Sequence, residues 1–238
     1  MSKIKTAMVM AAGHGTRMRP LTNDRAKAMV ELGGQPLIGH MLERLTQAGV
    51  KRAVVNVHAH ADHLEDYLRA QPYNIDIVIS DERDALLETG GGVVKALPLL
   101  GEAPILICNI DAIWAEFAPV LPQLIGQWDG DKMDELFLLA RRDTALGYDG
   151  QGDFDMDSHG VLTRRSGDSA PYIYAGVEIF KPRLAAPFKE EKFSRNLIWN
   201  KTLAKRRVCG AQLSGFWMHV GDPKARAAAE AVWKQSKR

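Results

Sequence analysis

The first half of the chain alternates between short, continuous apolar runs and longer segments whose apolar residues recur every three or four positions. The continuous runs predict buried strands at residues 6–12, 54–57, 75–79 and 104–109. The helical spacing predicts helices at residues 36–48 and 60–68, and Gly49 is placed to end the first of them. Strands that alternate with helices predict an α/β fold, a Rossmann-like and mainly parallel twisted sheet with helices on both faces.

The second half of the chain has fewer strand–helix repeats. Residues 114–128 predict a helix with prolines near its start, and residues 135–140 predict another buried strand. Apolar residues flank a turn at 158–160, so residues 150–163 predict a β-hairpin, and residues 171–180 predict a further strand. The sheet is therefore expected to continue into this half, with a small β-hairpin subregion beside it.

Composition narrows the class of protein. The 238 residues are 46% hydrophobic and 25% charged, the balance of an ordinary soluble globular protein, and favour a single domain over residues 1–238. The formal net charge of +2 gives no reason to expect a nucleic-acid partner, and no segment approaches the length of a membrane span. The two cysteines lie in apolar runs, which excludes a disulfide scaffold and favours a cytoplasmic protein. Because His58, His60 and His63 lack zinc-motif spacing, we expect packing or surface histidines. The oligomeric state stays open.

The stretch after the first strand has the composition of an anion-binding loop. Gly13 and Gly15 let backbone N–H groups approach a ligand closely. Arg17, Arg19 and Lys27 follow these glycines. Three cations around a glycine loop favour a polyanion such as a nucleoside triphosphate.

Two common phosphate-binding loops fit this stretch less well. A P-loop requires glycine-lysine-serine/threonine, which does not follow here. A dinucleotide-binding loop requires a third glycine where Met18 stands, and an acidic residue after the second strand, where residues 56–58 stand. A dehydrogenase with a nicotinamide cofactor is therefore an alternative that lacks two of its expected residues.

Polar and small residues also follow later strands. Asn109 and Asp111 bring side-chain oxygens to the carboxyl edge of the sheet, where α/β proteins bind ligands. Phosphoryl transfer needs an oxygen ligand for Mg²⁺, which makes Asp111 a candidate. Gly90 and Gly91 open an apolar helical pattern and leave room for a flat ring against the backbone.

These features occur together in one known family. Residues 11–22, with the sequence AAGHGTRMRPLT, resemble the signature of the sugar-1-phosphate nucleotidyltransferases, and Lys27 and the segment 33–38 continue the match. The segment 88–92 and Asp111 resemble two further motifs of that family. The resemblance covers nearly the whole chain and implies the GT-A-like nucleotidyltransferase fold.

The resemblance also implies a role for each matching residue. Nucleotide contacts are expected from Ala11, Ala12, Gly13, Gly15, Thr16, Arg17, Gly90 and Gly91. Sugar contacts are expected from Glu88, Asn109, Asp153 and Gly176. Arg17, Lys27 and Asp111 are expected to be catalytic, with Lys27 stabilising charge on the α-phosphate. Residues 1–111 would then form the nucleotide-binding half and residues 112–238 the sugar-binding half.

The implied metal site departs from the family pattern. Asp111 matches the family's first metal ligand, but His219, at the end of a predicted strand, stands where the family has its second aspartate. The resemblance implies Mg²⁺ as the cofactor. Mn²⁺ is an alternative, because the imidazole of His219 suits Mn²⁺ better than it suits Mg²⁺. Ile110 replaces the usual glycine before Asp111, and Ala26 replaces the usual proline before Lys27.

The reaction implied by the resemblance joins a nucleoside triphosphate to a sugar 1-phosphate and releases pyrophosphate. Within the family, the short chain favours UTP and N-acetylmuramate 1-phosphate as substrates, in peptidoglycan recycling. Guanylyl transfer to mannose or heptose 1-phosphate is an alternative. Because three motif positions differ from the family, a homologue that binds nucleotide or sugar phosphate without catalysis is another.

Overall fold

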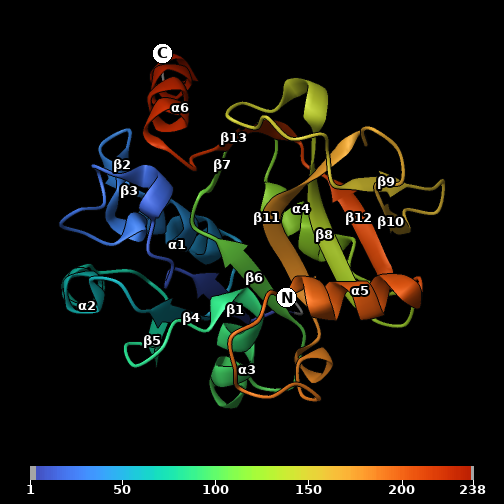
Figure 1. Cartoon of the computed structure of the whole chain (residues 1–238), viewed down its shortest axis with the longest axis horizontal. Coiled ribbons are helices and arrows are strands. Elements are labelled where there is room, and N and C mark those ends of the chain that lie inside the picture. Colours follow the sequence, from blue (N-terminus) through green and yellow to red (C-terminus); the bar gives the residue numbers. More distant parts are fainter. Residues whose placement is uncertain (1–3, 237–238) are drawn as a thin grey trace.

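The structure is a computed structural model that describes residues 4–236. Within this range a nine-stranded sheet runs through the molecule, with helices on both of its faces (Figure 1). The strands that the first half of the chain contributes to this sheet are β1 (Thr6–Met10), β4 (Arg52–Val57), β5 (Asp76–Asp81) and β6 (Ile105–Asn109). They lie in the order β6-β1-β4-β5, and all neighbours among them are parallel. This confirms the mainly parallel α/β sheet predicted from the alternation of strands and helices.

The same sheet continues into the second half. Its strands there are β8 (Glu135–Arg141), β9 (Phe154–Met156), β10 (Leu162–Arg164), β11 (Tyr172–Phe180) and β12 (Val208–Gln212). β11 pairs antiparallel with both β6 and β8, and β12 runs parallel to β8. β9 and β10 form the predicted hairpin. The antiparallel strand β11 therefore joins the two halves of the chain in one sheet.

Two groups of helices cover the two faces of the sheet. The helices are α1 (Leu37–Gln47), α2 (Ala61–Ala70), α3 (Glu88–Leu100), α4 (Val120–Gly126) and α5 (Asn196–Ala204). α1, α2 and α4 pack into one core with Val9 and Val55, whereas α3 and α5 pack into the other with Met8 and Val54. Successive strand residues point to opposite faces, so a strand covered on both sides needs a continuous apolar run.

Shorter elements complete the chain. Helix α6 (Pro223–Ser236) begins with a proline, a favoured first residue of a helix. It contacts the small β2–β3 hairpin (Glu31–Leu32, Gln35–Pro36), where the Gly33 N–H donates to Glu230 Oε2 at 2.9 Å. The 3₁₀ turns are η1 (Thr16–Met18), η2 (Lys27–Met29), η3 (Arg142–Thr144) and η4 (Pro182–Leu184).

The predicted helix at residues 114–128 is wrong in its first part. Residues Ala112–Glu116 form strand β7, and helix α4 begins only after Pro119. Trp114 is 0% exposed, and large aromatic residues fit a pleated strand pair well. Periodicity alone does not separate a short apolar strand followed by a short helix from one longer helix.

The partner of β7 brings two distant segments together. β13 (Gly215–His219) pairs antiparallel with β7, so that Trp217 lies opposite Trp114. His219 lies opposite Ala112 in this register. Asp111, the residue before β7, therefore comes close to His219.

A buried cluster of charged groups lies between the sheet and α5. Glu178 of β11 and Arg195 form an ion pair at 3.1 Å, with side chains 0% and 3% exposed. Glu135 of β8 is also fully buried. Burial, and after it the charge of Glu178, raises the pKa of Glu135 above its ordinary value. Folded Glu135 therefore keeps its proton at pH values where the unfolded chain would lose it.

Replacing Glu135 with glutamine is expected to flatten the pH dependence of stability. Above the ordinary glutamate pKa of 4.5, the unfolded chain binds fewer protons than the folded one, so stability falls as pH rises towards the raised pKa. Glutamine has no proton to lose. Between about pH 5 and pH 8 the wild type should therefore lose about 1 kcal/mol or more of unfolding free energy relative to the variant.

Urea unfolding at several pH values measures this difference. Glu190→Gln is the control, because the Glu190 side chain is 53% exposed and its curve should parallel that of the wild type. Parallel curves for the wild type and Glu135→Gln would contradict the assignment of the proton to Glu135.

Cys108 and Cys209 are buried free thiols, and burial raises the pKa of both. No disulfide therefore contributes to the fold within residues 4–236. None of the helices in the described range combines the length and the apolar character needed to cross a bilayer.

Candidate active site

A cavity of about 410 Å³ opens at the carboxyl ends of β1, β4 and β6. It is lined by residues with a role expected from sequence, namely Ala11, Ala12, Gly13, Lys27, Glu88, Asn109 and Asp111. It is also lined by residues to which the sequence assigned no role, namely Met10, Asn56, Leu86, Thr89, Ile110 and Ser194. Open α/β sheets bind ligands beyond the carboxyl ends of their strands, so this cavity is the candidate substrate site.

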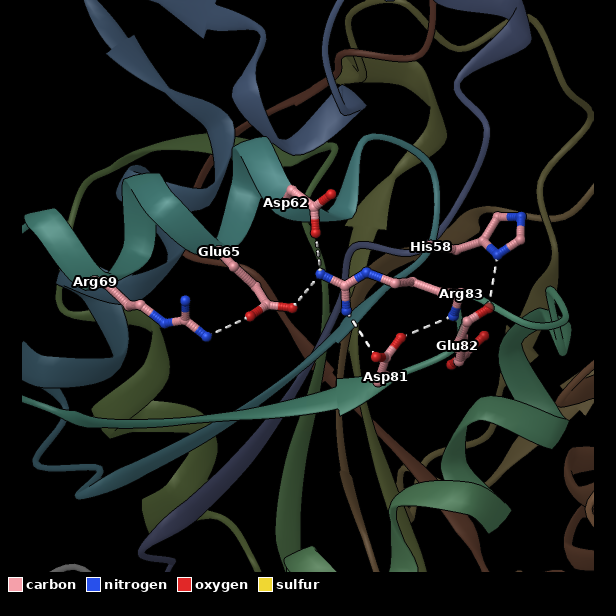
Figure 2. Close-up of polar contacts among 7 residues, drawn as sticks. All are labelled: His58, Asp62, Glu65, Arg69, Asp81, Glu82 and Arg83. Carbon is pink, nitrogen blue, oxygen red and sulfur yellow. Dashed lines mark hydrogen bonds and ion pairs between the residues drawn. The ribbon is translucent and has the colours of Figure 1, made fainter.

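A buried polar network connects two walls of the cavity. Asn56 Oδ1 accepts the Ala11 N–H at 2.7 Å, and Asn56 Nδ2 donates to Glu82 Oε1 at 2.7 Å. Glu82 is 0% exposed and also accepts the Leu87 N–H at 3.2 Å. Its carbonyl oxygen lies 2.7 Å from His58 Nδ1, which gives this histidine a packing role (Figure 2). Asn56 and Glu82 had a signal in the sequence, since each is a polar residue at the end of an apolar strand.

A second set of contacts fastens the same loop to helix α2. Figure 2 shows the Arg83 guanidinium donating to Asp62 and Glu65 of α2, each at 2.6 Å, and to Asp81 at 2.7 Å. Three carboxylates around one guanidinium make a charge network rather than an isolated surface pair. The loop that brings Leu86 to the cavity is therefore held on its outer side as well.

The two glycines of the first loop have different surroundings. Gly13 lies exposed at the cavity, with open space where a Cβ would be. Gly15 has φ 63°, which glycine adopts readily, and its carbonyl accepts the Thr22 hydroxyl at 2.8 Å. Gly15 thus turns the chain into η1, where Thr16 and Arg17 are exposed; Gly15, Thr16 and Arg17 are not among the residues that line the cavity. Gly13 is the one that leaves backbone open towards a ligand.

Lys27, Asp111 and His219 come together from three distant parts of the sequence. Lys27 Nζ lies 2.6 Å from Asp111 Oδ2, and His219 Nε2 lies 3.7 Å from the same oxygen. The three side chains are 13%, 21% and 27% exposed, respectively. The Val220 N–H also donates to the Asp111 carbonyl at 3.0 Å. The β7–β13 pairing therefore builds the pair Asp111 and His219, and Lys27 is added from the first loop.

Neighbouring charges set the protonation of this group. Burial alone would raise the pKa of Asp111, but the charge of Lys27, and at acid pH that of protonated His219, outweigh burial and hold this pKa below its ordinary value. Burial lowers the pKa of His219; Asp111 opposes this effect, whereas Lys27 and Arg17 add to it. At neutral pH Asp111 is therefore an anion and His219 is a neutral imidazole.

This donor set fits a divalent cation. His219 Nε2 and Asn109 Oδ1 are buried with no hydrogen-bond partner among the described residues. A neutral imidazole and a carboxylate are both ligands of first-row divalent metals. Within residues 4–236 no cluster of three His, Cys, Asp or Glu side chains is arranged to hold a metal. Two protein ligands are typical of Mg²⁺ sites that draw their other ligands from water and substrate phosphates.

The structure gives Gly90 and Gly91 contacts other than the predicted ones. Their N–H groups donate to the Phe193 carbonyl at 2.9 and 3.3 Å. A Cβ on Gly90 would overlap the Phe193 ring, and one on Gly91 would overlap the Glu191 carbonyl. Neither glycine lines the cavity, although Thr89 does. These glycines are required because another segment of the chain packs closely on the start of α3.

The four residues expected to contact a sugar fall into two groups. Glu88 and Asn109 line the cavity, whereas Asp153 and Gly176 do not. The Asp153 carboxylate accepts a backbone N–H of β11 at 2.9 Å, which fastens the hairpin segment to the sheet. Gly176 has φ 87° at a bulge of β11, and a Cβ there would meet Ala112. Asp153 and Gly176 therefore have roles in the fold itself, which the sequence did not indicate.

Known proteins resemble this chain over nearly its whole length. Residues 6–139 match the nucleotidyl transferase family. The chain is 49% identical to N-acetylmuramate alpha-1-phosphate uridylyltransferase of Caulobacter vibrioides, covering 95% of this chain and 96% of that one. It is 31% identical to the protein of the same name from Neisseria meningitidis, covering 96% and 99%. In fold it resembles UDP-glucose pyrophosphorylase complexed with UDP-glucose, with a TM-score of 0.79 and 17% identity over 99% of this chain and 100% of that one.

The parallel sheet, the glycine loop and the cavity at the carboxyl edge are the features of a nucleotide-binding α/β enzyme. The chain belongs to the nucleotidyl transferase family and is a sugar-1-phosphate nucleotidyltransferase. This confirms the family resemblance noted in the sequence.

Proposed function

We propose that the protein transfers the uridylyl group of UTP to N-acetylmuramate α-1-phosphate, forming a nucleotide sugar and pyrophosphate. The observation that carries this proposal is the 49% identity, over 95% of the chain, with a uridylyltransferase of that substrate. The grouping of Lys27, Asp111 and His219, of which the first two line the cavity, supports catalysis over binding alone, because a cation and the two proposed metal ligands lie together. The buried thiols suit a reducing cytoplasm, which is the location we propose.

The proposed reaction is a direct displacement at the α-phosphorus. A phosphate oxygen of the sugar 1-phosphate forms a bond to the α-phosphorus of UTP. The bond between the α-phosphorus and the oxygen that bridges to the β-phosphorus breaks, and pyrophosphate leaves with the electron pair of that bond. Positioning and charge neutralisation carry the rate of such a step. Lys27 stabilises the charge at the α-phosphate, and the Gly13 backbone with Arg17 holds the β- and γ-phosphates. A divalent cation held by Asp111 and His219 would neutralise phosphate charge.

Pyrophosphate release tests this proposal. The purified protein is assayed with each of the four common nucleoside triphosphates against several sugar 1-phosphates, in Mg²⁺ and again in Mn²⁺. We expect release with UTP and N-acetylmuramate 1-phosphate. Release only with GTP and mannose or heptose 1-phosphate would contradict the proposed substrates. Tight nucleotide binding without any release of pyrophosphate would contradict the proposed catalysis.

Replacing His219 with aspartate is expected to shift the metal preference towards Mg²⁺. A carboxylate is a better ligand for Mg²⁺ than an imidazole, whereas imidazole suits Mn²⁺. The ratio of kcat/KM in Mg²⁺ to that in Mn²⁺ should rise at least about fivefold, which corresponds to about 1 kcal/mol. His63→Asp, at an exposed position of α2, is the control. An unchanged ratio would exclude His219 from the metal site.

A further inference from the structure

We propose that Arg195 is a positioning residue, through which the buried Glu178 fixes the paired segments 87–91 and 191–195, called the wall here because Glu88, Thr89 and Ser194 of these segments line the cavity. The inference rests on the proposed function in one respect, since it takes UTP as the nucleotide that this wall receives. Neither Arg195 nor Glu178 lines the cavity, so their effect is transmitted through the residues that do.

The wall consists of two backbone segments joined by hydrogen bonds. The Phe193 N–H donates to the Leu87 carbonyl at 3.2 Å, and the Phe193 carbonyl accepts the Gly90 N–H at 2.9 Å. The backbone N–H of Arg195 donates to Thr89 Oγ1 at 2.9 Å. In Figure 1 the segment that leads into α5 passes beside α3. Any shift of this segment would therefore move Thr89, which lines the cavity.

The Arg195 side chain holds this wall to the central sheet. Its guanidinium forms the 3.1 Å ion pair with Glu178 and donates to the Tyr174 hydroxyl at 3.0 Å. It also lies 5.1 Å from the centre of the Trp199 ring. Glu178 and Tyr174 belong to β11, which pairs with β6, and β6 ends two residues before Asp111. Arg195 thus links the segment that holds Thr89 to β11, the neighbour of the strand that leads to Asp111.

The chemistry of a buried ion pair favours a role in geometry over a role in stability. A buried pair often adds no more stability than apolar residues of similar volume, because both charges lose their hydration. The Arg195 guanidinium, however, combines a directional hydrogen bond from Nη2 to the Tyr174 hydroxyl with the ion pair to Glu178, and both partners belong to β11. Apolar residues at these positions could fill the same volume without fixing the same position of the wall.

The test separates these two roles with a single and a double variant. Arg195→Met leaves Glu178 buried without its partner, so its thermal midpoint should fall sharply. The double variant Arg195→Met/Glu178→Leu removes both charges and should recover most of the midpoint. We expect calorimetry with UTP and Mg²⁺ to give a Kd at least about fivefold higher for the double variant than for the wild type. In turnover, KM for UTP should rise by a similar factor while kcat changes less than about threefold.

Lys181→Met is the matched control. Lys181 forms a largely buried ion pair with Asp134 at 2.7 Å, but it follows the end of β11 that lies beside the start of β6, away from the cavity. Its loss should lower the thermal midpoint and leave the UTP affinity unchanged.

Each outcome decides the proposal. A double variant that is stable and binds UTP within about twofold of the wild type would show that Arg195 serves only packing. A wild type that binds UTP but releases no pyrophosphate would remove the proposed function, and the comparison of UTP affinities would still test Arg195. A wild type that does not bind UTP would overturn both.

Discussion

Replacing Lys27 with alanine is expected to lower kcat for pyrophosphate release by on the order of 10²–10³. Lys27 lines the cavity and is the cation in closest contact with Asp111, at 2.6 Å. Alanine removes the positive charge that is proposed to stabilise the α-phosphate in the transition state. The fold should remain intact, because the pair is near the surface of the cavity and is not part of the apolar core.

Steady-state kinetics and a circular dichroism spectrum measure both parts of this expectation. Arg25→Ala is the matched control, since Arg25 lies two residues earlier, is 42% exposed and pairs with Asp24. Its kcat should stay within about twofold of the wild type. A Lys27→Ala enzyme with wild-type kcat would remove Lys27 from the mechanism.

Replacing Asp111 with asparagine is expected to reduce kcat by on the order of 10³ or more. Asparagine keeps the shape of the side chain but removes the anion, which the structure holds with a lowered pKa beside Lys27 and His219. The variant should also bind Mn²⁺ more weakly, because one of the two proposed protein ligands has lost its charge. Electron paramagnetic resonance titration of free Mn²⁺ measures this second effect independently of turnover.

Asp76→Asn is the control for this substitution. Asp76 also pairs with a cation, Arg52 at 2.8 Å, but at the start of β5, the end of the strand opposite the cavity. Its replacement should change neither kcat nor the affinity for Mn²⁺. Wild-type Mn²⁺ affinity in Asp111→Asn would exclude this carboxylate as a metal ligand.

The sequence predicts those parts of the fold in which local pattern and tertiary environment agree. β1, β4 and β6 are continuous apolar runs, and the structure buries them between helices on both faces. The same run fixes where the glycine loop begins, so Ala11 to Gly13 are found at the cavity as expected. Polar residues at strand ends also give a usable signal, as Asn109 and Asp111 show.

Other parts depend on partners that are distant in the sequence. The segment after Asp111 pairs with β13, about a hundred residues later, and nothing local to it distinguishes this strand from a helix. Gly90 was expected to face a ligand. A glycine in a sequence indicates that another group approaches the backbone closely, but it does not indicate which group. The structure shows that the Phe193 ring is the neighbour of Gly90. The ion pair of Arg195 and Glu178 joins two segments whose local sequences contain no sign of each other.

Phosphorus NMR of a single reaction tests the central claim most directly. Wild-type protein is mixed with UTP, N-acetylmuramate α-1-phosphate and Mg²⁺ or Mn²⁺, and the products are followed over time. The proposed displacement predicts that pyrophosphate and a uridine diphosphate sugar appear in equal amounts while both substrates disappear together. Hydrolysis of UTP with the sugar phosphate unchanged, or unchanged spectra from a protein that binds UTP, would contradict it.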